Sequence, residues 1–269
     1  MRLGSEFRAF AVTVGEDIDR LREFANLLRE VNLGGTAIGT GINTPEGYST
    51  LVIRHLSEVS GVELVPAGDL IEATSDMGAF VTFSGVLKRI AVKLSKICND
   101  LRLLGSGPRA GLGEIKLPAV QAGSSIMPGK VNPTQCEALT MIAAQVMVND
   151  VTIGIGGSNG HFELNVFKPV MIFNFLHSAR LIGDGCVSFN DKCAVGIKPI
   201  NANIKKHLDN SLMLVTSLNT KIGYYKSAEI AQKAHKEGTT LKEMAVKLGY
   251  VTAKEFDEWV IPANMVGKI

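Results

Sequence analysis

The sequence predicts an all-α protein, in which a bundle of long helices is followed by a small helical domain. Three observations predict this class. Apolar residues recur at helical spacing over two long stretches, glycine-rich segments interrupt these stretches, and no segment alternates as a β-strand does. The character of the sequence changes to short helices near residue 196, so we expect a bundle domain at 1–196 and a second domain at 197–269.

The two long stretches are each expected to form one helix. From Phe7 to Val31, apolar residues return at every third or fourth position and charged residues occupy the other positions. From Phe80 to Leu104 the alternation of three and four is strict, which is typical of the seam of a coiled-coil-like bundle helix. A helix of about 25 residues is roughly 38 Å long. We expect two more bundle helices, at 134–149 and 167–189.

Glycine and proline mark the ends of these helices. The four glycines between Leu33 and Asn43 end the first helix and allow the backbone to approach other segments closely. Thr44 and Pro45 match the N-cap and the first position of a shorter helix, which should end near Gly61. Further along the chain, Pro133 is expected to begin the helix that follows the second glycine-rich break.

The last seventy or so residues carry two explicit helix starts. Thr240 is followed three residues later by Glu243, and Thr252 in the same way by Glu255. Each pair matches the capping box, in which the hydroxyl and the carboxylate satisfy free backbone amides at a helix N-terminus. The sequence therefore predicts short, capped helices in the second domain.

Composition and charge exclude several classes of protein. Lys and Arg number 28 against 26 Asp and Glu, and no basic run with interleaved aromatics is present, so nucleic acid is not an expected partner. No apolar stretch reaches the roughly 20 residues that span a bilayer, and the first residues do not resemble a signal peptide. We therefore expect no membrane partner.

The cysteines give no sign of a metal site. Cys98, Cys136, Cys186 and Cys193 are far apart in the sequence and form no CxxC pair, so neither a zinc ligand set nor a disulfide framework can be derived from them. Reduced thiols are expected. No metal and no cofactor are predicted.

The segment Gly123–Pro133, with the sequence GSSIMPGKVNP, concentrates groups that can act on an anion. Lys130 and Asn132 offer a positive charge and an amide, and the helix that begins at Pro133 adds a positive dipole end. Each residue also has a structural interpretation: Asn132 as an N-cap, Lys130 as a surface lysine, and the serines as part of a turn. Together, in this order, they favour a functional site.

This segment resembles the signature loop of the aspartase/fumarase lyase superfamily, and we call residues 123–133 the signature loop. The family eliminates water or an amine from a succinyl group in the anti sense and forms fumarate. The resemblance implies that Ser124 is the general base for the C3 proton and that Glu137 orients a catalytic histidine. It implies that the substrate is held by Ser125, Lys130, Val131 and Asn132. For Glu137 a favourable charge in the first helical turn is the alternative.

The resemblance covers the whole chain, but its two halves differ. Downstream segments look like class II fumarase, and upstream segments look more like aspartase. The downstream segments are 134–137, 156–165, 166–169, 176–180 and 255–259, and the upstream segments are 7–10, 30–33, 69–76 and 87–102. We give more weight to the downstream half, because residues 134–137 adjoin the signature loop.

The family builds each active site from three motif regions on three subunits, and this sequence contains one of them. The serine-rich carboxylate-binding loop and the catalytic histidine motif are not found in it. None of the five histidines matches that motif, and structural or surface roles are expected for His55, His161, His177, His207 and His235.

The resemblance therefore implies a lyase of the tricarboxylic acid cycle that hydrates fumarate to malate, with a site that this chain alone leaves incomplete. It also implies a dicarboxylate substrate and a homotetramer, in which a separate N-terminal chain can complement this one. The implied location is the cytoplasm or, in a eukaryote, the mitochondrial matrix. Two alternatives stay open: an aspartate ammonia-lyase, and a non-catalytic helical assembly subunit.

Overall fold

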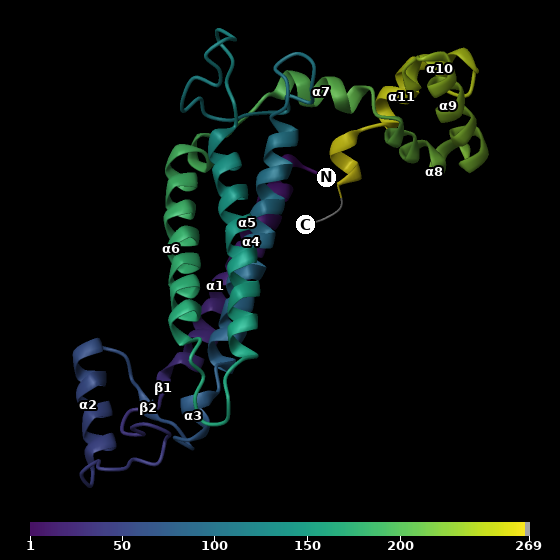
Figure 1. Ribbon diagram of the computed structural model, residues 1–269. Coiled ribbons are helices and arrows are strands. Elements are labelled where there is room, and N and C mark those ends of the chain that lie inside the picture. Colours follow the sequence, from purple (N-terminus) through teal and green to yellow (C-terminus); the bar gives the residue numbers. More distant parts are fainter. Residues whose placement is uncertain (267–269) are drawn as a thin grey trace. The chain divides into compact units, whose positions relative to one another are not determined.

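The structure is a computed structural model that describes residues 1–266 (Figure 1). Its Cα positions divide into two compact units, which we describe separately. The bundle unit comprises residues 10–103 and 117–197, and the terminal unit comprises residues 1–9, 104–116 and 198–266. The predicted domains 1–196 and 197–269 stay a prediction.

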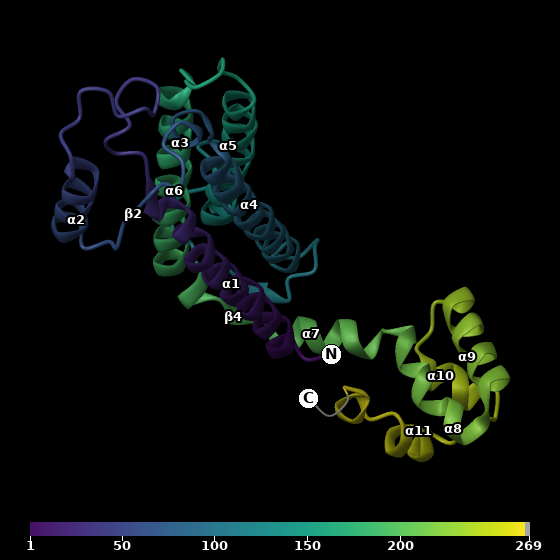
Figure 2. The ribbon, with the colours of Figure 1, turned by 90° about the horizontal axis from the view of Figure 1, so that it is seen from below.

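Long helices make up the bundle unit, as the sequence predicts. They are α1 (Leu3–Ala25), α4 (Gly78–Leu104), α5 (Thr134–Gly157) and α6 (Lys168–Lys192). Figures 1 and 2 both show these helices side by side, with α5 and α6 antiparallel to each other. The α5 and α6 helices are longer than expected. Pro169 lies in the first turn of α6, where its missing N–H has no helical partner to lose.

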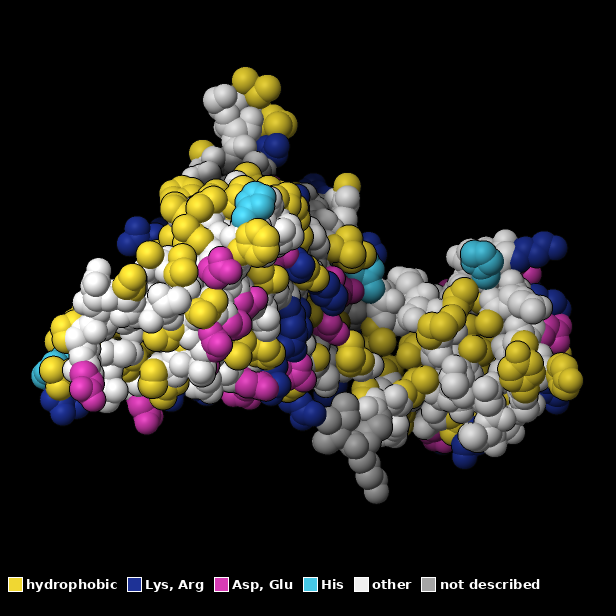
Figure 3. Space-filling model, turned by 60° about the horizontal axis from the view of Figure 1, so that its bottom comes forward, with side chains coloured by type: hydrophobic (Ala, Val, Ile, Leu, Met, Phe, Trp, Pro, Cys, Tyr) yellow, Lys and Arg dark blue, Asp and Glu magenta, His cyan; other side chains and the backbone are white. Residues whose placement is uncertain are grey.

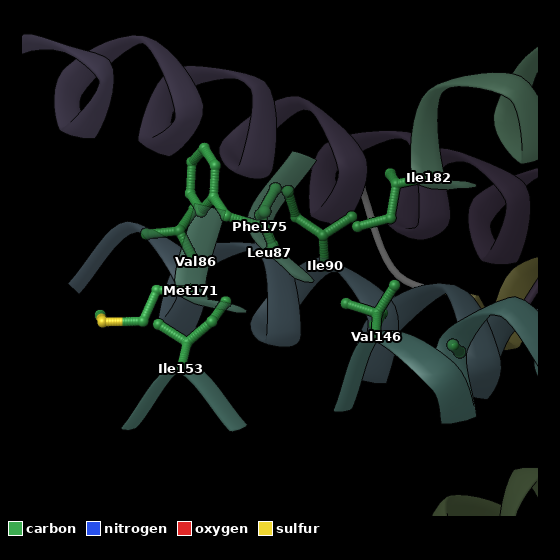
Figure 4. Packing of buried hydrophobic residues seen from close by; sticks show 10 residues of the cluster. Val86, Leu87, Ile90, Val146, Ile153, Met171, Phe175 and Ile182 are labelled. Atoms are coloured by element: carbon green, nitrogen blue, oxygen red, sulfur yellow. The ribbon is translucent and has the colours of Figure 1, made fainter. Parts of the chain in front are cut away.

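The core of the bundle is the predicted seam of α4 packed on the inner faces of α5 and α6. Leu87, Ile90 and Ile97 of α4 are buried, which confirms the predicted face. Figure 4 shows Leu87 and Ile90 beside Phe175 of α6. The Phe175 ring also meets two α4 rings edge-on, with centroid distances of 5.4 Å to Phe80 and 5.2 Å to Phe83.

Glycine allows α5 and α6 to approach closely. A Cβ atom on Gly156 of α5 would lie 2.5 Å from the Met171 side chain, and one on Gly185 of α6 would lie 2.7 Å from that of Ile142. A buried hydrogen bond joins the same helices, because Asn149 Nδ2 donates to Ser178 Oγ at 3.0 Å. The bulk removed at the two glycines therefore fixes the distance between these helices.

The segment between α1 and α4 corrects two predictions. The first helix ends at Ala25 rather than Val31. Residues 26–29 form a 3-10 turn, and residues 30–31 form a short strand whose backbone hydrogen bonds go to a parallel strand at residues 65–66. Thr44 is not an N-cap: its hydroxyl donates to the Gly34 carbonyl at 3.2 Å. The elements are η1 (Asn26–Arg29), β1 (Glu30–Val31), α2 (Tyr48–Ser60), β2 (Val65–Pro66) and α3 (Glu72–Ser75). The predicted stop at Gly61 is confirmed.

The terminal unit consists of short elements around a second apolar cluster. The two-residue strands β3 and β4 pair antiparallel. Ile230, Met244 and Phe256 belong to the buried cluster. In order the elements are β3 (Ile115–Lys116), β4 (Lys198–Pro199), α7 (Asn201–Asp209), η3 (Leu212–Leu218), α8 (Asn219–Ile222), α9 (Tyr224–Glu237), α10 (Leu241–Lys247), α11 (Ala253–Trp259) and η4 (Pro262–Met265), while η2 (Ala194–Gly196) closes the bundle unit.

Both predicted capping boxes are confirmed. Thr240 caps α10 and Thr252 caps α11, each through its hydroxyl and the carboxylate three residues later. The backbone N–H of Thr240, which donates to Glu243 at 2.8 Å, and then the Thr240 hydroxyl lower the pKa of the Glu243 carboxyl. These caps fix where the two short helices begin.

Three of the four thiols, distant in sequence, meet in the bundle. Cys136 at the start of α5 hydrogen-bonds with Cys98 of α4 and with Cys193 after α6, and all three are buried. The Cys193 hydrogen bond acts to lower the pKa of Cys136, but the Cys98 hydrogen bond and burial outweigh it and raise this pKa to about 12. The Cys136 hydrogen bond and burial also raise the pKa of Cys193. The cluster therefore packs as neutral thiols.

One helix of the bundle unit bears on the expectation of no membrane partner. By length and composition, α5 is apolar enough to cross a bilayer, and it is the one such helix among residues 1–266. Apolar residues occur on more than one face of α5. One face packs on α6, and Val148 and Val151 on another face are exposed. A core helix of a soluble protein has the same composition, so this is weak evidence for a membrane.

We predict opposite effects for two neighbouring threonines in the terminal unit. Thr240→Val removes the cap of α10 and should lower the free energy of unfolding by about 1 kcal/mol. Thr239→Val should not lower it, because the buried Thr239 hydroxyl has no hydrogen-bond partner among residues 1–266 and a methyl group replaces it. Hydrogen exchange of the α10 amides and thermal melting measure both. Equal losses in the two variants would contradict the capping account.

We also predict alkaline destabilisation by the thiol cluster. The folded pKa of Cys136 lies above the ordinary value of 9.0, so the contribution is complete below pH 9.0 and is lost as pH rises towards about 12. The free energy of unfolding should fall by up to about 1.4 kcal/mol per pH unit for each such thiol. Denaturant titrations between about pH 8 and 10.5 measure how the free energy of unfolding changes with pH. This pH dependence should be weaker for Cys136→Ala than for the parent chain. An unchanged slope would argue against the account.

Candidate active site

The signature loop is closed at its base by backbone and side-chain hydrogen bonds. The Gly123 N–H donates to the Lys130 carbonyl at 2.8 Å, and the Lys130 N–H donates to the Met127 carbonyl at 3.2 Å. Asn132 Nδ2 donates to the Gly123 carbonyl at 3.1 Å. Gly123 thus lies against the far end of the loop, and Lys130 and Asn132 meet there.

This closure requires glycine at two positions. A Cβ atom on Gly123 would lie 2.9 Å from the Asn132 backbone nitrogen and 2.9 Å from the Lys130 carbonyl oxygen, closer than real Cβ atoms come. Gly129 has a φ of 80°, in the left-handed region. The signature glycines therefore shape the loop, and the serine, lysine and asparagine side chains carry its chemistry.

Ser124 is fixed by the loop's own backbone. Its half-buried Oγ accepts hydrogen bonds from the N–H groups of Ile126, at 3.2 Å, and Met127, at 3.1 Å. Two donors that converge on one hydroxyl oxygen also stabilise a negative charge there. The arrangement can therefore favour a serine alkoxide.

The remaining predicted binding residues lie at the surface of this single chain. Ser125, Lys130 and Val131 are exposed, and Ile126 at the tip is 85% exposed. Their side chains can meet a ligand or another chain without any rearrangement of the core.

Asn132 does not cap the helix, so its structural interpretation is wrong. The residue before α5 is Pro133, and it makes no side-chain cap. The Asn132 amide is committed to Gly123 instead. The N-terminus of α5 therefore begins without a side-chain acceptor for its free amides, a feature that favours an anion nearby.

Glu137 lies one turn into α5, beside a residue that the sequence did not single out. Arg102 Nη2 of α4 is 4.0 Å from Glu137 Oε1. In the same turn, Gln135 Oε1 accepts a hydrogen bond from Ser188 Oγ of α6 at 2.9 Å. Helices α4 and α6 thus both touch the first turn of α5 and hold it next to the loop.

Sequence reasoning missed these supporting residues. Arg102 and Ser188 are 35 and 53 positions from their partners, so no spacing rule links them. The buried Thr134 hydroxyl, which has no hydrogen-bond partner within the described part of the chain, was also missed, because threonine after an Asn-Pro pair is ordinary. Only knowledge of which helices pack together could have found them.

A cavity of about 880 Å³ lies elsewhere in the bundle unit, between the start of α4 and the start of α6. Its lining includes Asn32, Asp76, Phe80 and Lys168 but none of the predicted site residues. The cavity is about 25 Å along α4 from Cys98, and Cys98 contacts Cys136 in the first turn of α5, just after the signature loop. This cavity therefore does not coincide with the signature loop. Among residues 1–266, no three His, Cys, Asp or Glu side chains are grouped to hold a metal ion.

Comparison with known proteins agrees with the motif. The sequence model of a family described as Lyase matches residues 1–148, and that of the Fumarase C C-terminus matches residues 214–267. The chain is 55% identical over 269 residues to the class II fumarate hydratase of Pasteurella multocida. This alignment covers 100% of this chain and 58% of that protein. The chain is 53% identical over 267 residues to the human mitochondrial fumarate hydratase, with 99% and 52% covered.

A solved structure has the same fold. The class II fumarase of Schistosoma mansoni superposes with a TM-score of 0.91 at 36% identity, over 98% of this chain and 58% of that chain. The chain thus spans little more than half the length of these relatives. The similarity to fumarate hydratases includes the upstream half, so aspartase is not favoured there. The chain belongs to the aspartase/fumarase lyase family, on the fumarase side of it.

Proposed function

We propose that this chain supplies the signature-loop part of a fumarate hydratase, which interconverts fumarate and malate by anti addition and elimination of water. The single observation that carries the proposal is the closed base of the signature loop, which we call the pinch. There Gly123 is hydrogen-bonded to Lys130 and Asn132, next to the fixed hydroxyl of Ser124. The similarity to fumarate hydratases supports water rather than ammonia as the leaving group.

Ser124 is the proposed base. In the direction of dehydration it removes the C3 proton of malate, and in the direction of hydration it returns one to fumarate. A serine hydroxyl is a weak base unless its anion is stabilised. The two amides at 3.1 and 3.2 Å from Oγ provide that stabilisation without a change in loop structure.

Lys130 and Asn132, with Ser125 and Val131, are the proposed substrate-binding residues. Removal of a proton beside a carboxylate places a second negative charge on that carboxylate, so fixed positive charge must balance it. Lys130 supplies a charge, and the uncapped N-terminus of the 24-residue helix α5 supplies a dipole. Both act more strongly on the dianion than on the substrate, which is the condition for catalysis.

Glu137 is proposed to orient a histidine that activates water on the opposite side of the substrate. The relatives are longer than this chain, and we expect that histidine and a second carboxylate-binding loop in residues beyond those aligned. The Glu137 carboxylate can accept an N–H from that histidine, and Arg102 Nη2 lies 4.0 Å from Glu137 Oε1.

The proposed enzyme is a homotetramer that works in the cytoplasm or in the mitochondrial matrix. Exposed apolar residues along α5 and α6, among them Val148, Val151 and Phe173, support self-association, because water does not favour such contiguous surface. The relatives include both bacterial and mitochondrial fumarate hydratases, which supports both locations. A complementing N-terminal chain would serve the same purpose as a longer subunit.

We predict that Ser124→Ala abolishes hydration while assembly stays intact. The test uses the chain completed with the N-terminal portion of a fumarate hydratase, and fumarate absorbance follows turnover. The rate should fall by at least about a thousandfold, as for loss of a catalytic base. Lys130→Ala should raise KM and lower kcat, since both the bound substrate and the dianionic intermediate would lose the positive charge of Lys130.

The non-catalytic alternative predicts a different pattern for the same variants. If the loop were only a turn, Ser124→Ala would leave malate formation unchanged, and an active Ser124→Ala protein would end the claim for this base. Asn132→Ala should open the pinch and lower turnover with little change in melting temperature, because Asn132 does not cap α5. A loss of stability of about 1 kcal/mol with full activity would instead support the capping role.

We predict that the chain self-associates to a tetramer through its long helices. Sedimentation velocity should show a species of about four chains at micromolar concentration, because the exposed apolar stripes are buried only in an assembly. A compact monomer at every concentration would contradict the assembly and would leave the proposal for Ser124 untouched.

A further inference from the structure

The first turn of α5, residues 134–137, lies between two parts of the proposed site. Asn132, which closes the signature loop, comes two residues before this turn, and Glu137, which is proposed to orient the histidine, lies at its end. The turn begins without a side-chain cap. Because the first amides of a helix have no partner within it, contacts from neighbouring helices must fix the direction in which this turn points.

One hydrogen bond from α6 holds the turn. Ser188 Oγ donates to Gln135 Oε1 at 2.9 Å, and both side chains are half-buried. Two other contacts of the turn are weaker. Arg102 Nη2 is 4.0 Å from Glu137 Oε1, and the Cys136 thiol is a poor donor and a poor acceptor. Of these three contacts, the Ser188 hydroxyl therefore makes the strongest one.

The close approach of α5 and α6 makes this hydrogen bond possible. Gly185 precedes Ser188 by three positions, so both lie on the face of α6 that packs against α5. A Cβ atom on Gly185 would lie 2.7 Å from the Ile142 side chain and 3.1 Å from that of Leu139. Serine has a short side chain, and it reaches Gln135 because glycine one turn away lets the two helices come close.

The Ser188–Gln135 hydrogen bond lies in a different setting from the charged surface. Figure 3 shows charged side chains in a band on the surface of the bundle, beside hydrophobic ones. Water competes for exposed ion pairs, so they contribute little to orientation. A half-buried acceptor that loses its donor has less water to replace it, so removal of Ser188 Oγ leaves Gln135 Oε1 poorly satisfied. The first turn of α5 then loses its link to α6.

We propose that Ser188 is a positioning residue of the hydration reaction, which acts through Gln135 on the first turn of α5. This proposal rests on the proposed function and adds a residue outside the signature loop. The hydrogen bond fixes the direction of the free amides of this turn and the place of Glu137, while Lys130 binds the substrate independently of it. A misplacement of about 1 Å can lower turnover by about a hundredfold. Loss of the Ser188 hydroxyl should therefore lower kcat more than it raises KM.

Alanine substitutions at two serines separate positioning from stability. In the enzyme completed with the N-terminal portion of a fumarate hydratase, Ser188→Ala should lower kcat by about tenfold or more, with KM within about twofold of the parent. The matched control is Ser84→Ala. The buried Ser84 Oγ of α4 donates to Asp150 Oδ1 of α5 at 2.8 Å, about 22 Å along α5 from Gln135. Because its acceptor is charged, Ser84→Ala should lower the melting temperature at least as much as Ser188→Ala, with unchanged kcat.

A second substitution tests the route through Gln135. Gln135→Met keeps the length of the side chain but removes the acceptor. The kcat of Gln135→Met, and of the double variant with Ser188→Ala, should therefore equal that of Ser188→Ala within about twofold.

Three results would overturn the proposal while the proposed function stands. They are a kcat of Ser188→Ala within about twofold of the parent, equal losses of kcat in Ser188→Ala and Ser84→Ala, and losses that multiply in the double variant. A completed parent enzyme that does not hydrate fumarate would overturn both proposals.

Discussion

The close packing of α5 against α6 is the constraint on which the rest of the bundle depends. Gly156 and Gly185 remove the bulk that would separate these helices, and the buried Asn149–Ser178 hydrogen bond fixes their alignment. The signature loop leads into the first residue of α5, and residues 158–167 join the last turn of α5 to α6. A single helix pair thus supports both the proposed chemistry and the proposed assembly surface.

Each hydrogen bond that shapes the signature loop involves at least one of its backbone groups. The Gly123 N–H donates to the Lys130 carbonyl, and the Asn132 side-chain amide donates to the Gly123 carbonyl. The N–H groups of residues 126 and 127 donate to Ser124 Oγ. The Lys130 side chain takes no part in these hydrogen bonds and is exposed, which is consistent with its proposed role in substrate binding. A site built in this way is preorganised for negative charge while it stays open on a single chain, as expected of a site completed by other subunits.

The sequence predicted whatever depends on local pattern. The α4 seam, the stop at Gly61 and the caps at Thr240 and Thr252 follow from spacing and side-chain chemistry within a few residues, and all are confirmed. The meeting of Cys98, Cys136 and Cys193 and the approach of Arg102 to Glu137 depend on which helices pack together. Local preference also failed at Thr44 and Asn132, where a longer-range hydrogen bond replaced the expected cap.

Turnover of the Gly123→Ala variant in the completed enzyme decides whether the closed signature loop is the catalytic element. The added methyl group cannot fit within 2.9 Å of Asn132 and Lys130, so the pinch must open while the helices remain. We expect the rate of malate formation to fall by about a hundredfold or more, with unchanged helical content and melting temperature. Turnover equal to that of the parent would contradict it.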